Sequence, residues 1–282
     1  MKILIVGGTS SLSRAMLPVL SQFASVVTAG RSGCDIQMDL AAARGELNIP
    51  DAVDVVINTA AAFGGTGADA LTDAEGVNAL GVLRLCRACT RAGVRRLVLI
   101  SSIFAQLEAH SPFFGIYALS KRHSEELGGL YSAQFGLPIT VVRPSQFYGP
   151  GGSYRRHHPF LAAIIDKAAR GEDILIHGKN DALRNFIHEI DVATAVARAV
   201  QRGIAGTYAC MSPLNVRYSQ VADAAIAAFG SASAVRFAPE KPDIPDNIFE
   251  PDDSLFRLID YYPRISIEQG MRIEAVQRQI AR

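Results

Sequence analysis

The stretch KILIVGGTSSLSRAMLPVLSQF, residues 2–23, decides the fold class of the chain. Its first part, Lys2–Val6, is a short apolar run rich in β-branched residues, which is typical of a strand covered on both faces in a parallel sheet. A glycine-rich turn follows, and apolar residues then recur at helical spacing, namely Leu12, Met16, Leu17 and Leu20. Pro18 is expected to bend or shorten this helix. Strand, tight turn and helix in this order predict the opening of a βαβ unit, whose helix start presents free backbone N–H groups to a pyrophosphate.

Further short apolar runs predict more strands of the same sheet. They are SVVTA at 25–29, DVVINTAAA at 54–62, RLVLISS at 96–102 and LPITVVRPSQFY at 137–148. We therefore expect an α/β fold, a Rossmann-type doubly wound parallel sheet with a smaller C-terminal substrate lobe. The expected dinucleotide-binding domain covers residues 1–150, with 181–202 returning to it, and the substrate lobe covers 151–180 and 203–282.

Composition excludes several classes of protein. Apolar residues make up 49% of the 282 and charged ones 20%, with a net charge of +1, which is an ordinary globular balance. This charge favours neither nucleic acid nor an anionic membrane surface as a partner. The opening KILIVGG is too short for the apolar part of a signal peptide, and no apolar run reaches the roughly 18 residues that span a bilayer. We expect a cytoplasmic protein.

The four cysteines do not predict a metal or redox site. Cys86 and Cys89 form a C-x-x-C pair, but they lie in VNALGVLRLCRACTRAG, whose apolar spacing is helical and which has no second Cys or His pair nearby. Buried helix positions are the expected role of this pair. Cys34 and Cys210 have no motif around them.

The segment FFGIYALSKR, residues 113–122, places Tyr117 and Lys121 four residues apart. In a helix this spacing puts both side chains on one face, about one turn from each other. Tyrosine ordinarily titrates near about 10, and a nearby cation is expected to lower that pKa. Tyr117 could then pass a proton to or from a carbinol oxygen while hydride moves at the carbon. Ser102, at the end of the run 96–102, precedes Tyr117 by fifteen residues, enough for a loop and a helix start to bring the two together.

These residues resemble those of the extended short-chain dehydrogenases/reductases of the NAD-dependent epimerase/dehydratase family, and the resemblance runs nearly from end to end. It implies that Ser102 orients the substrate carbonyl, that Tyr117 is the acid and that Lys121 holds the nicotinamide ribose. The family's G-x-x-G-x-x-G turn is only partly kept, since the chain reads Gly7, Ser10 and Ser13. Serine at the third position is expected to add bulk where helix and strand pack closely.

The resemblance also implies a set of cofactor-binding residues. They are Gly7, Thr9, Ser10, Ser11, Leu12, Arg31, Ser32, Asp39, Leu40, Thr59, Ala60, Ala61, Asn78, Tyr117, Lys121, Pro144 and Ser145. Arg31 and Ser32 stand near the end of the second expected strand, where an acidic residue would hold the ribose of NAD, and the first acid is Asp35. NADP is therefore the expected cofactor, with NAD as the alternative if Arg31 is only a solvated loop charge. Asn78, in a helix expected to begin near Glu75, matches an Asn that the family uses to hold the backbone of the site.

The substrate residues implied by the resemblance are Ser102, Phe104, Tyr117, Gln146 and Arg184. Gln146 stands where the family's R-P-x-N-x-Y-G turn has Asn, and Arg184 opens a segment similar to R-x-F-x-H-x-x-D-V-A, whose Arg binds the diphosphate of a nucleotide-sugar. An exposed loop Arg is the alternative for Arg184. The stretch YRRHHP, residues 154–159, is expected to be a substrate-facing or solvated loop and not a metal site.

Ile103 and Phe104 reduce the number of reactions that the site could catalyse. The family's 4,6-dehydratases carry an acidic pair directly after the catalytic Ser or Thr, and two apolar residues cannot replace it. A 4-ketoreductase or a 4-epimerase of a nucleotide-activated sugar is left, and Arg31 favours the reductase because a reductase draws on the NADPH pool. A non-catalytic redox sensor and a scaffold or RNA-associated relative stay open. A homodimer through helices at 80–92 and 118–135 is implied by the family.

Overall fold

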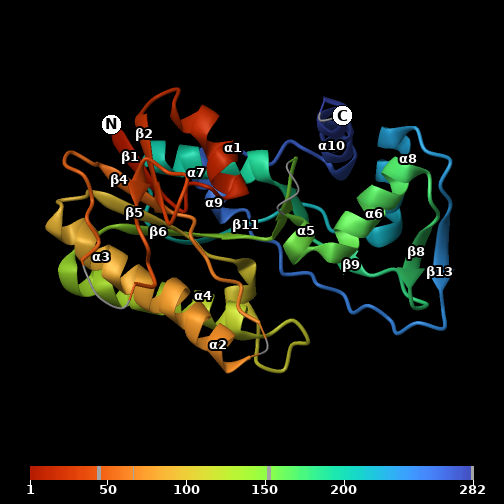
Figure 1. The fold of residues 1–282 in the computed structure, drawn as a ribbon, viewed down its shortest axis with the longest axis horizontal. Helices are drawn as coiled ribbons and strands as arrows, with labels where there is room; N and C mark the ends of the chain where they lie inside the picture. The colour runs from red at the N-terminus through yellow and green to blue at the C-terminus, as the bar shows by residue number, and fades with distance from the viewer. Residues whose placement is uncertain (43–45, 66, 151–153, 281–282) are drawn as a thin grey trace. The chain divides into compact units, whose positions relative to one another are not determined.

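The computed structural model describes residues 1–42, 46–65, 67–150 and 154–280, and the chain divides into two compact units (Figure 1). The first unit comprises residues Met1–Pro144, Ala193–Cys210 and Ser254–Tyr261. The second comprises Ser145–Val192, Met211–Asp253 and Tyr262–Arg282.

The first unit is built on a seven-stranded sheet in the order β11-β6-β5-β4-β1-β2-β3. Its strands are β1 (Lys2–Val6), β2 (Ser25–Gly30), β3 (Ile36–Gln37), β4 (Val55–Asn58), β5 (Arg96–Ile100), β6 (Ile139–Pro144) and β11 (Gly206–Cys210). Every pair of neighbours is parallel; Leu4 of β1, for example, is in register with Val27 on one side and Val56 on the other. The strand order reverses between β1 and β4, which is where doubly wound sheets bind ligands at the carboxyl ends of their strands. The expected fold class is confirmed.

Helices cover both faces of this sheet. Those of the first unit are α1 (Ser11–Leu20), α2 (Ala68–Glu75), the π-helical turn η1 (Gly76–Leu80), α3 (Gly81–Arg91), the 3-10 turn η2 (Ile103–Gln106), α4 (Ile116–Phe135), most of α7 (Glu189–Arg202) and α9 (Ser254–Ile259). Figure 1 shows α2, α3 and α4 on one side of the strands and α1, α7 and α9 on the other. The helix expected near Glu75 begins earlier, at Ala68, directly after Gly67. Pro18 falls in the last turn of α1, which ends two residues later at Leu20, so the missing hydrogen bond from its nitrogen affects only the end of the helix.

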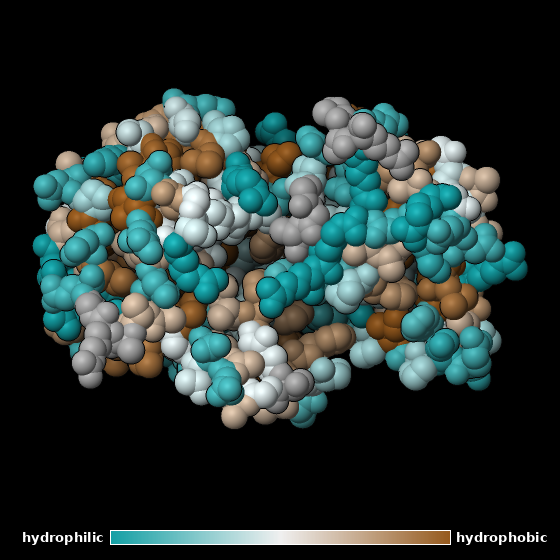
Figure 2. All heavy atoms as spheres, in the orientation of Figure 1, coloured by the Kyte–Doolittle hydropathy of each residue, from teal (hydrophilic) through white to brown (hydrophobic). Residues whose placement is uncertain are grey.

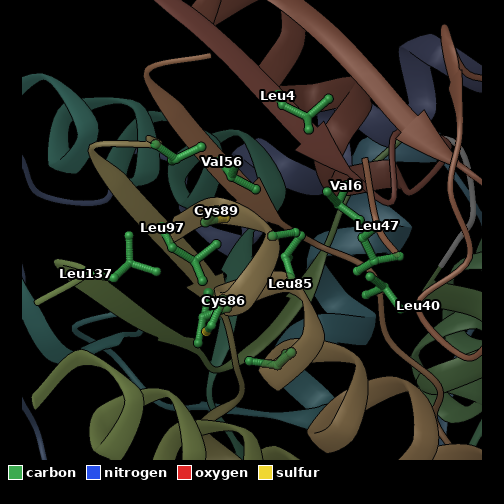
Figure 3. Close-up of a cluster of buried hydrophobic side chains, with 14 of the residues drawn as sticks. Leu4, Val6, Leu40, Leu47, Val56, Leu85, Cys86, Cys89, Leu97 and Leu137 are labelled. Carbon is green, nitrogen blue, oxygen red and sulfur yellow. The ribbon is translucent and has the colours of Figure 1, made fainter. Parts of the chain in front are cut away.

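The core of the first unit explains the two neighbouring cysteines. Cys86 and Cys89 of α3 are fully buried among strand residues that include Leu4, Val56 and Leu97 (Figure 3). Burial raises the pKa of the Cys86 thiol to about 12 and raises that of Cys89 as well. Both side chains therefore pack as small apolar groups, as the helical spacing predicts.

The second unit has three small sheets of two strands each. In these β7 (Gln146–Tyr148) pairs with β10 (Phe186–His188), β9 (Leu183–Arg184) with β12 (Val216–Arg217), and β8 (Ile174–His177) with β13 (Val235–Ala238). Its helices are α5 (Tyr154–His157), α6 (Pro159–Arg170), α8 (Tyr218–Phe229) and α10 (Ile267–Ile280), to which the first residues of α7 are added. Residues 154–159 are not the loop that the sequence suggests, because Tyr154 is buried and donates to Glu274 (2.9 Å) and Arg155 pairs with Asp166.

The boundaries of the units differ from the expected domains. Residues 193–210 and 254–261 belong to the first unit, because β11 pairs with β6 and α9 packs against β11. Residues 145–150 and 181–192 belong to the second, because β7 pairs with β10 there. The expected boundary at Gly151 lies outside the described residues.

Within the described ranges, no helix is both long enough and apolar enough to cross a membrane. On the face shown in Figure 2, hydrophilic and hydrophobic residues are interspersed.

Candidate active site

The turn after β1 is fitted closely to the end of β4. Gly7 has φ +89°, and a Cβ at this position would stand 2.6 Å from both the Ala60 nitrogen and Thr59 Oγ1. The Thr59 and Ala60 N–H groups both donate to the Val6 carbonyl, at 2.8 and 3.2 Å. Only glycine tolerates this backbone conformation and this close approach.

A cluster of three hydroxyls accommodates the serines that replace the family's glycines. Ser13 is fully buried, and its Oγ lies 2.9 Å from the Gly7 carbonyl and 2.8 Å from Thr59 Oγ1. Ser10 Oγ lies 2.9 Å from Ser13 Oγ and 3.1 Å from Thr59 Oγ1, and it accepts from the Ser13 N–H as the N-cap of α1. Both serine hydroxyls thus point toward Thr59. The Ser13 side chain, expected to crowd the packing of helix and strand, instead forms hydrogen bonds there.

The start of α1 fits the pyrophosphate of a dinucleotide. Among the described residues, none accepts a hydrogen bond from the backbone N–H of Ser11 or Leu12. Unpaired N–H groups in a first helical turn form a ready anion site, strengthened by the helix dipole. Ser10, Ser11 and Leu12 would hold the diphosphate of a cofactor there.

The end of β2 carries a cation and an acid with different surroundings. Arg31 and Ser32 are exposed, and Arg31 has no hydrogen bond or ion pair within the described part of the chain. Asp35 is bound to β2, where its Oδ2 accepts from the Thr28 N–H and from Thr28 Oγ1, each at 2.8 Å. These hydrogen bonds, the backbone one first, lower the pKa of Asp35. Asp35, the first acid that could hold the ribose of NAD, is therefore already hydrogen-bonded to Thr28. The Arg31 guanidinium has no such partner among the described residues.

Three other residues expected to bind the cofactor, Asp39, Leu40 and Thr9, differ in exposure. Asp39 is exposed and accepts from the Ala41 N–H at 2.9 Å. Leu40 is buried in the core, and its carbonyl accepts from Arg84 at 2.9 Å. Thr9 is exposed, and its carbonyl accepts from Arg14 at 2.8 Å.

Asn78 joins the end of β4 to α4. Its side chain accepts from the Ala62 N–H at 2.8 Å and donates to the Ala62 carbonyl at 2.6 Å. It also donates to Ser120 Oγ at 2.9 Å, and Ser120 donates to the Tyr117 carbonyl at 3.2 Å. The π-helical turn that carries Asn78 is the kind of helix distortion often found at functional sites.

Ser102, Tyr117 and Lys121 converge where β5 ends and α4 begins. Tyr117 stands in the first turn of α4, where the Ser102 side chain is near enough to its phenol to act on the pKa of that group. Lys121 is 4% exposed, with Nζ 5.9 Å from the centre of the Tyr117 ring and 2.8 Å from the Ile100 carbonyl that it donates to. The helical spacing expected for Tyr117 and Lys121 is present.

The charge state of Tyr117 differs from the expectation. Burial raises the pKa of Tyr117 to about 12, although the Ser102 side chain acts in the opposite direction. Burial lowers the pKa of Lys121 to about 8, although the Glu125 charge raises it. The expected lowering of the Tyr117 pKa by a cation is wrong here, because loss of solvent is the largest cause of the shift and outweighs the effect of Ser102. Tyr117 is protonated at neutral pH and can act as an acid.

Two neighbours of this site were not found from the sequence. Phe63 stacks on the Tyr117 ring, with centroids 4.7 Å apart and planes 12° from parallel. Glu125 stands one helical turn beyond Lys121 and pairs with Arg143 of β6. The K-x-x-x-E spacing could have indicated Glu125, whereas nothing local marks Phe63. Phe104, the expected substrate residue after Ser102, is half-buried, and its N–H donates to Ser102 Oγ at 3.2 Å.

The remaining expected residues lie mainly in the second unit. Gln146 Nε2 is 3.4 Å from Nδ1 of His158, whose pKa falls to about 4, chiefly through burial. Arg184 is only 3% exposed and donates to the Tyr218 hydroxyl at 2.9 Å and to the Pro245 carbonyl at 2.8 Å. The alternative of an exposed loop Arg is therefore wrong for Arg184. Ser145 is buried, and Pro144, the last residue of β6, belongs to the first unit.

Comparisons with known proteins identify the family of the chain. The model of the NAD dependent epimerase/dehydratase family matches residues 3–209. A stretch of 127 residues is 32% identical to a dTDP-4-dehydro-6-deoxy-D-allose reductase of Streptomyces bikiniensis, covering 45% of this chain and 39% of that protein. The match thus spans well under half the length of this curated relative.

Solved structures share the fold over the whole chain. The UDP-N-acetylglucosamine 4-epimerase from Bacillus cereus has a TM-score of 0.79 at 21% identity, covering 99% of this chain and 96% of that one. RMD from Pseudomonas aeruginosa, complexed with NADPH, has a TM-score of 0.79 at 19% identity, covering 100% and 99%. Since the family model matches well over half of its residues, the chain belongs to the NAD dependent epimerase/dehydratase family.

Proposed function

We propose that the protein reduces the 4-keto group of a nucleotide-activated sugar with NADPH. The observation that carries this proposal is the convergence of Ser102, Tyr117 and Lys121, with Tyr117 protonated at neutral pH. A protonated phenol beside a hydroxyl donor suits the direction in which a ketone gains a proton.

The mechanism assigns one task to each side chain. When bound, NADPH supplies the hydride that reduces the carbonyl carbon. Ser102 donates a hydrogen bond to the ketone oxygen and so favours the negative charge that develops there. Tyr117 transfers its phenolic proton to that oxygen, completing the hydroxyl, and is then reprotonated from solvent. The Lys121 ammonium stabilises the transient phenolate through its charge.

The choice of NADPH rests on the end of β2. Arg31 is an exposed guanidinium with no partner in the described residues, whereas Asp35 is held by Thr28. A free cation at this place suits the 2′-phosphate of NADP, and an engaged acid does not suit the ribose of NAD. RMD, which has the same fold, was solved with NADPH.

The choice of a nucleotide-sugar rests on the relatives. The Streptomyces bikiniensis protein is named a reductase of a dTDP-linked 4-dehydro sugar. In this chain Ile103 and Phe104 follow Ser102 and offer no acid for the elimination of water. Gln146 and Arg184 are proposed to contact the substrate phosphates. Nε of Arg184 donates to Tyr218 and Nη1 to the Leu183 and Pro245 carbonyls, so these two nitrogens reach a phosphate only if those bonds are shared or exchanged.

A steady-state assay tests the proposal. The oxidation of NADPH is followed at its nicotinamide absorbance with dTDP- and UDP-linked 4-keto-6-deoxyhexoses as substrates. Turnover is expected for the wild type, and Tyr117→Phe is expected to lower it by at least roughly a hundredfold, the usual contribution of a positioned acid. NADPH binding by the variant, measured by fluorescence, is expected to stay near that of the wild type. Equal turnover in both proteins would remove Tyr117 from the chemistry.

A 4-epimerase with tightly bound NAD is the second candidate, favoured by the shared fold with the Bacillus cereus 4-epimerase. An epimerase retains its cofactor on purification and interconverts two 4-hydroxy sugars without added NADPH. A redox sensor, in contrast, binds NADPH with no turnover of any substrate. The same preparation, assayed with and without added cofactor, separates the three.

A homodimer is also proposed. Leu80, at the junction of η1 and α3, and Leu130 and Phe135 of α4 are large apolar residues that are more than half exposed. Exposed apolar side chains on neighbouring helices are suited to pairing with a second copy. Sedimentation velocity is expected to show a species of twice the chain mass, and a monomer at micromolar concentration would contradict this.

A further inference from the structure

A buried carboxylate lies at the back of the candidate site. Glu125 follows Lys121 by one turn of α4 and is 9% exposed. Both of its oxygens accept from Arg143 Nε at 3.0 Å, and it also accepts from Arg143 Nη2. Ser101 Oγ donates a short hydrogen bond to the same carboxylate. All of these residues belong to the first unit.

Lys121 and Glu125 each form a hydrogen bond with a residue at the end of β5 or directly after it. The Ile100 carbonyl accepts from Lys121 Nζ at 2.8 Å, and the next residue, Ser101, is bound through its side chain to Glu125. Ser102, which meets Tyr117, follows directly. Two side chains one turn apart on α4 thus hold two consecutive residues, Ile100 and Ser101, directly before Ser102.

Two charged groups of opposite sign, Glu125 and Arg143, are considered around Lys121. Burial disfavours the ammonium, and Glu125 is the charged group that favours it. Arg143, from β6, carries a like charge and is paired with Glu125. Tyr117, from the same helix, is neutral at neutral pH, and the two residues after β5, Ser101 and Ser102, are uncharged. Glu125 is thus the charge that acts on Lys121, and Arg143 is the ion-pair partner of that carboxylate.

We propose that Glu125 is a positioning residue of the site: held by Arg143 and bound to Ser101, one helical turn from Lys121, its carboxylate fixes the strand end from which Ser102 projects and acts on the Lys121 ammonium. The catalytic consequence rests on the proposed function, but the effect on Lys121 does not. Removing the carboxylate moves the titration of Lys121 to lower pH, and removing Arg143 moves it to higher pH. If Glu125 and Arg143 only stabilised the fold, replacing either of them would leave the titration midpoint of Lys121 unchanged.

The titration can be measured without cofactor or substrate. The chain has five lysines, so ¹³C labelling of the lysine side chains gives few NMR signals, and the signal absent in Lys121→Met identifies Lys121. Its midpoint is expected near pH 8 in the wild type. Glu125→Gln, which keeps the shape and the acceptor for Ser101, is expected to lower the midpoint by about one unit. Glu126→Gln, one residue on and exposed, is the matched control and leaves it unchanged.

Arg143→Met is the second variant, with an expected rise of the midpoint, and it keeps the test open if Glu125→Gln does not fold. A midpoint in Glu125→Gln equal to that in Glu126→Gln, or one that falls in Arg143→Met, would overturn the proposal. If turnover with NADPH is found, its pH profile should shift with the same sign as the NMR midpoint. Absence of turnover in the wild type would contradict the proposed function alone, since the NMR titration is independent of it.

Discussion

Replacing Lys121 by methionine is expected to make the protein more stable at neutral pH, the opposite of most buried substitutions. Lys121 is 4% exposed, and burial lowers its pKa from an ordinary 10.5 to about 8. Each pKa unit corresponds to about 1.4 kcal/mol, so the charged lysine disfavours the folded state by about 3 kcal/mol. Methionine keeps the apolar stem, removes the charge and loses the hydrogen bond to the Ile100 carbonyl, worth about 1 kcal/mol. Glu125 keeps its pair with Arg143 in this variant.

The net gain at pH 7 is therefore about 2 kcal/mol, and it depends on pH in a defined way. Between pH 8 and 10.5 the unfolded wild-type chain binds more protons than the folded one, so wild-type stability rises with pH across this window. Lys121→Met lacks this rise. The difference between the two proteins should shrink as the pH increases and reverse to a deficit of about 1 kcal/mol once the lysine is neutral in both states.

Urea unfolding followed by circular dichroism at pH 7, 9 and 10.5 measures this difference. Lys167→Met, which removes a lysine from the second unit whose Nζ donates to the Asp173 carbonyl at the surface, is the control and should show no reversal. A Lys121→Met protein that is less stable than the wild type at pH 7, or a difference that does not vary with pH, would refute the assignment of a buried, destabilising ammonium.

Three further predictions concern the cofactor side of the site. Ser13→Gly restores the family's glycine, yet it should lower the free energy of unfolding by about 2 kcal/mol, because the contacts with Gly7 and Thr59 are lost and glycine weakens a helix. Urea unfolding measures this, and a variant as stable as the wild type would contradict a stabilising role for the Ser13 hydroxyl. Arg31→Ala should weaken NADPH binding about tenfold or more and leave NADH binding unchanged, as expected for a lost charge-assisted contact; fluorescence titrations with equal losses for both nucleotides would show that Arg31 does not read the 2′-phosphate. Phe63→Ala should expose the Tyr117 ring to solvent and lower the pKa of Tyr117 from about 12 toward 10. The absorbance of tyrosinate is measured against pH, and the curve of the double variant Phe63→Ala, Tyr117→Phe is subtracted. An unchanged midpoint would mean that Phe63 does not keep solvent from the ring.

What could be foreseen from the sequence depends on local pattern. The apolar runs that became β1, β2 and β5 are continuous in the chain, so their strands were predictable, and the spacing of Tyr117 and Lys121 holds within one helix. The contacts that sequence reasoning missed join distant segments. Thr59 supports Ser13 from 46 residues away, and Arg143 reaches Glu125 across 18.

Burial accounts for the other differences. The rise in the Tyr117 pKa reflects loss of solvent around the phenol, which no spacing rule contains. Arg184 was considered as a diphosphate ligand or an exposed charge, and its burial against Tyr218 became visible only in the folded second unit. The return of β11 to the sheet is visible only from its pairing with β6, since the run GTYAC at Gly206–Cys210 lacks the continuous aliphatic residues that mark β1 and β5.

The most direct test of the central claim follows the hydride itself. Wild-type protein is incubated with a nucleotide-linked 4-keto-6-deoxyhexose and with NADPH deuterated at one or the other face of the nicotinamide C4, and the product is examined by mass spectrometry and NMR. Direct reduction by NADPH beside Tyr117 predicts one deuterium at C4 of the sugar from one of the two labelled cofactors and none from the other. A reduced product without deuterium from either cofactor, or no reduced product at all, would contradict the account.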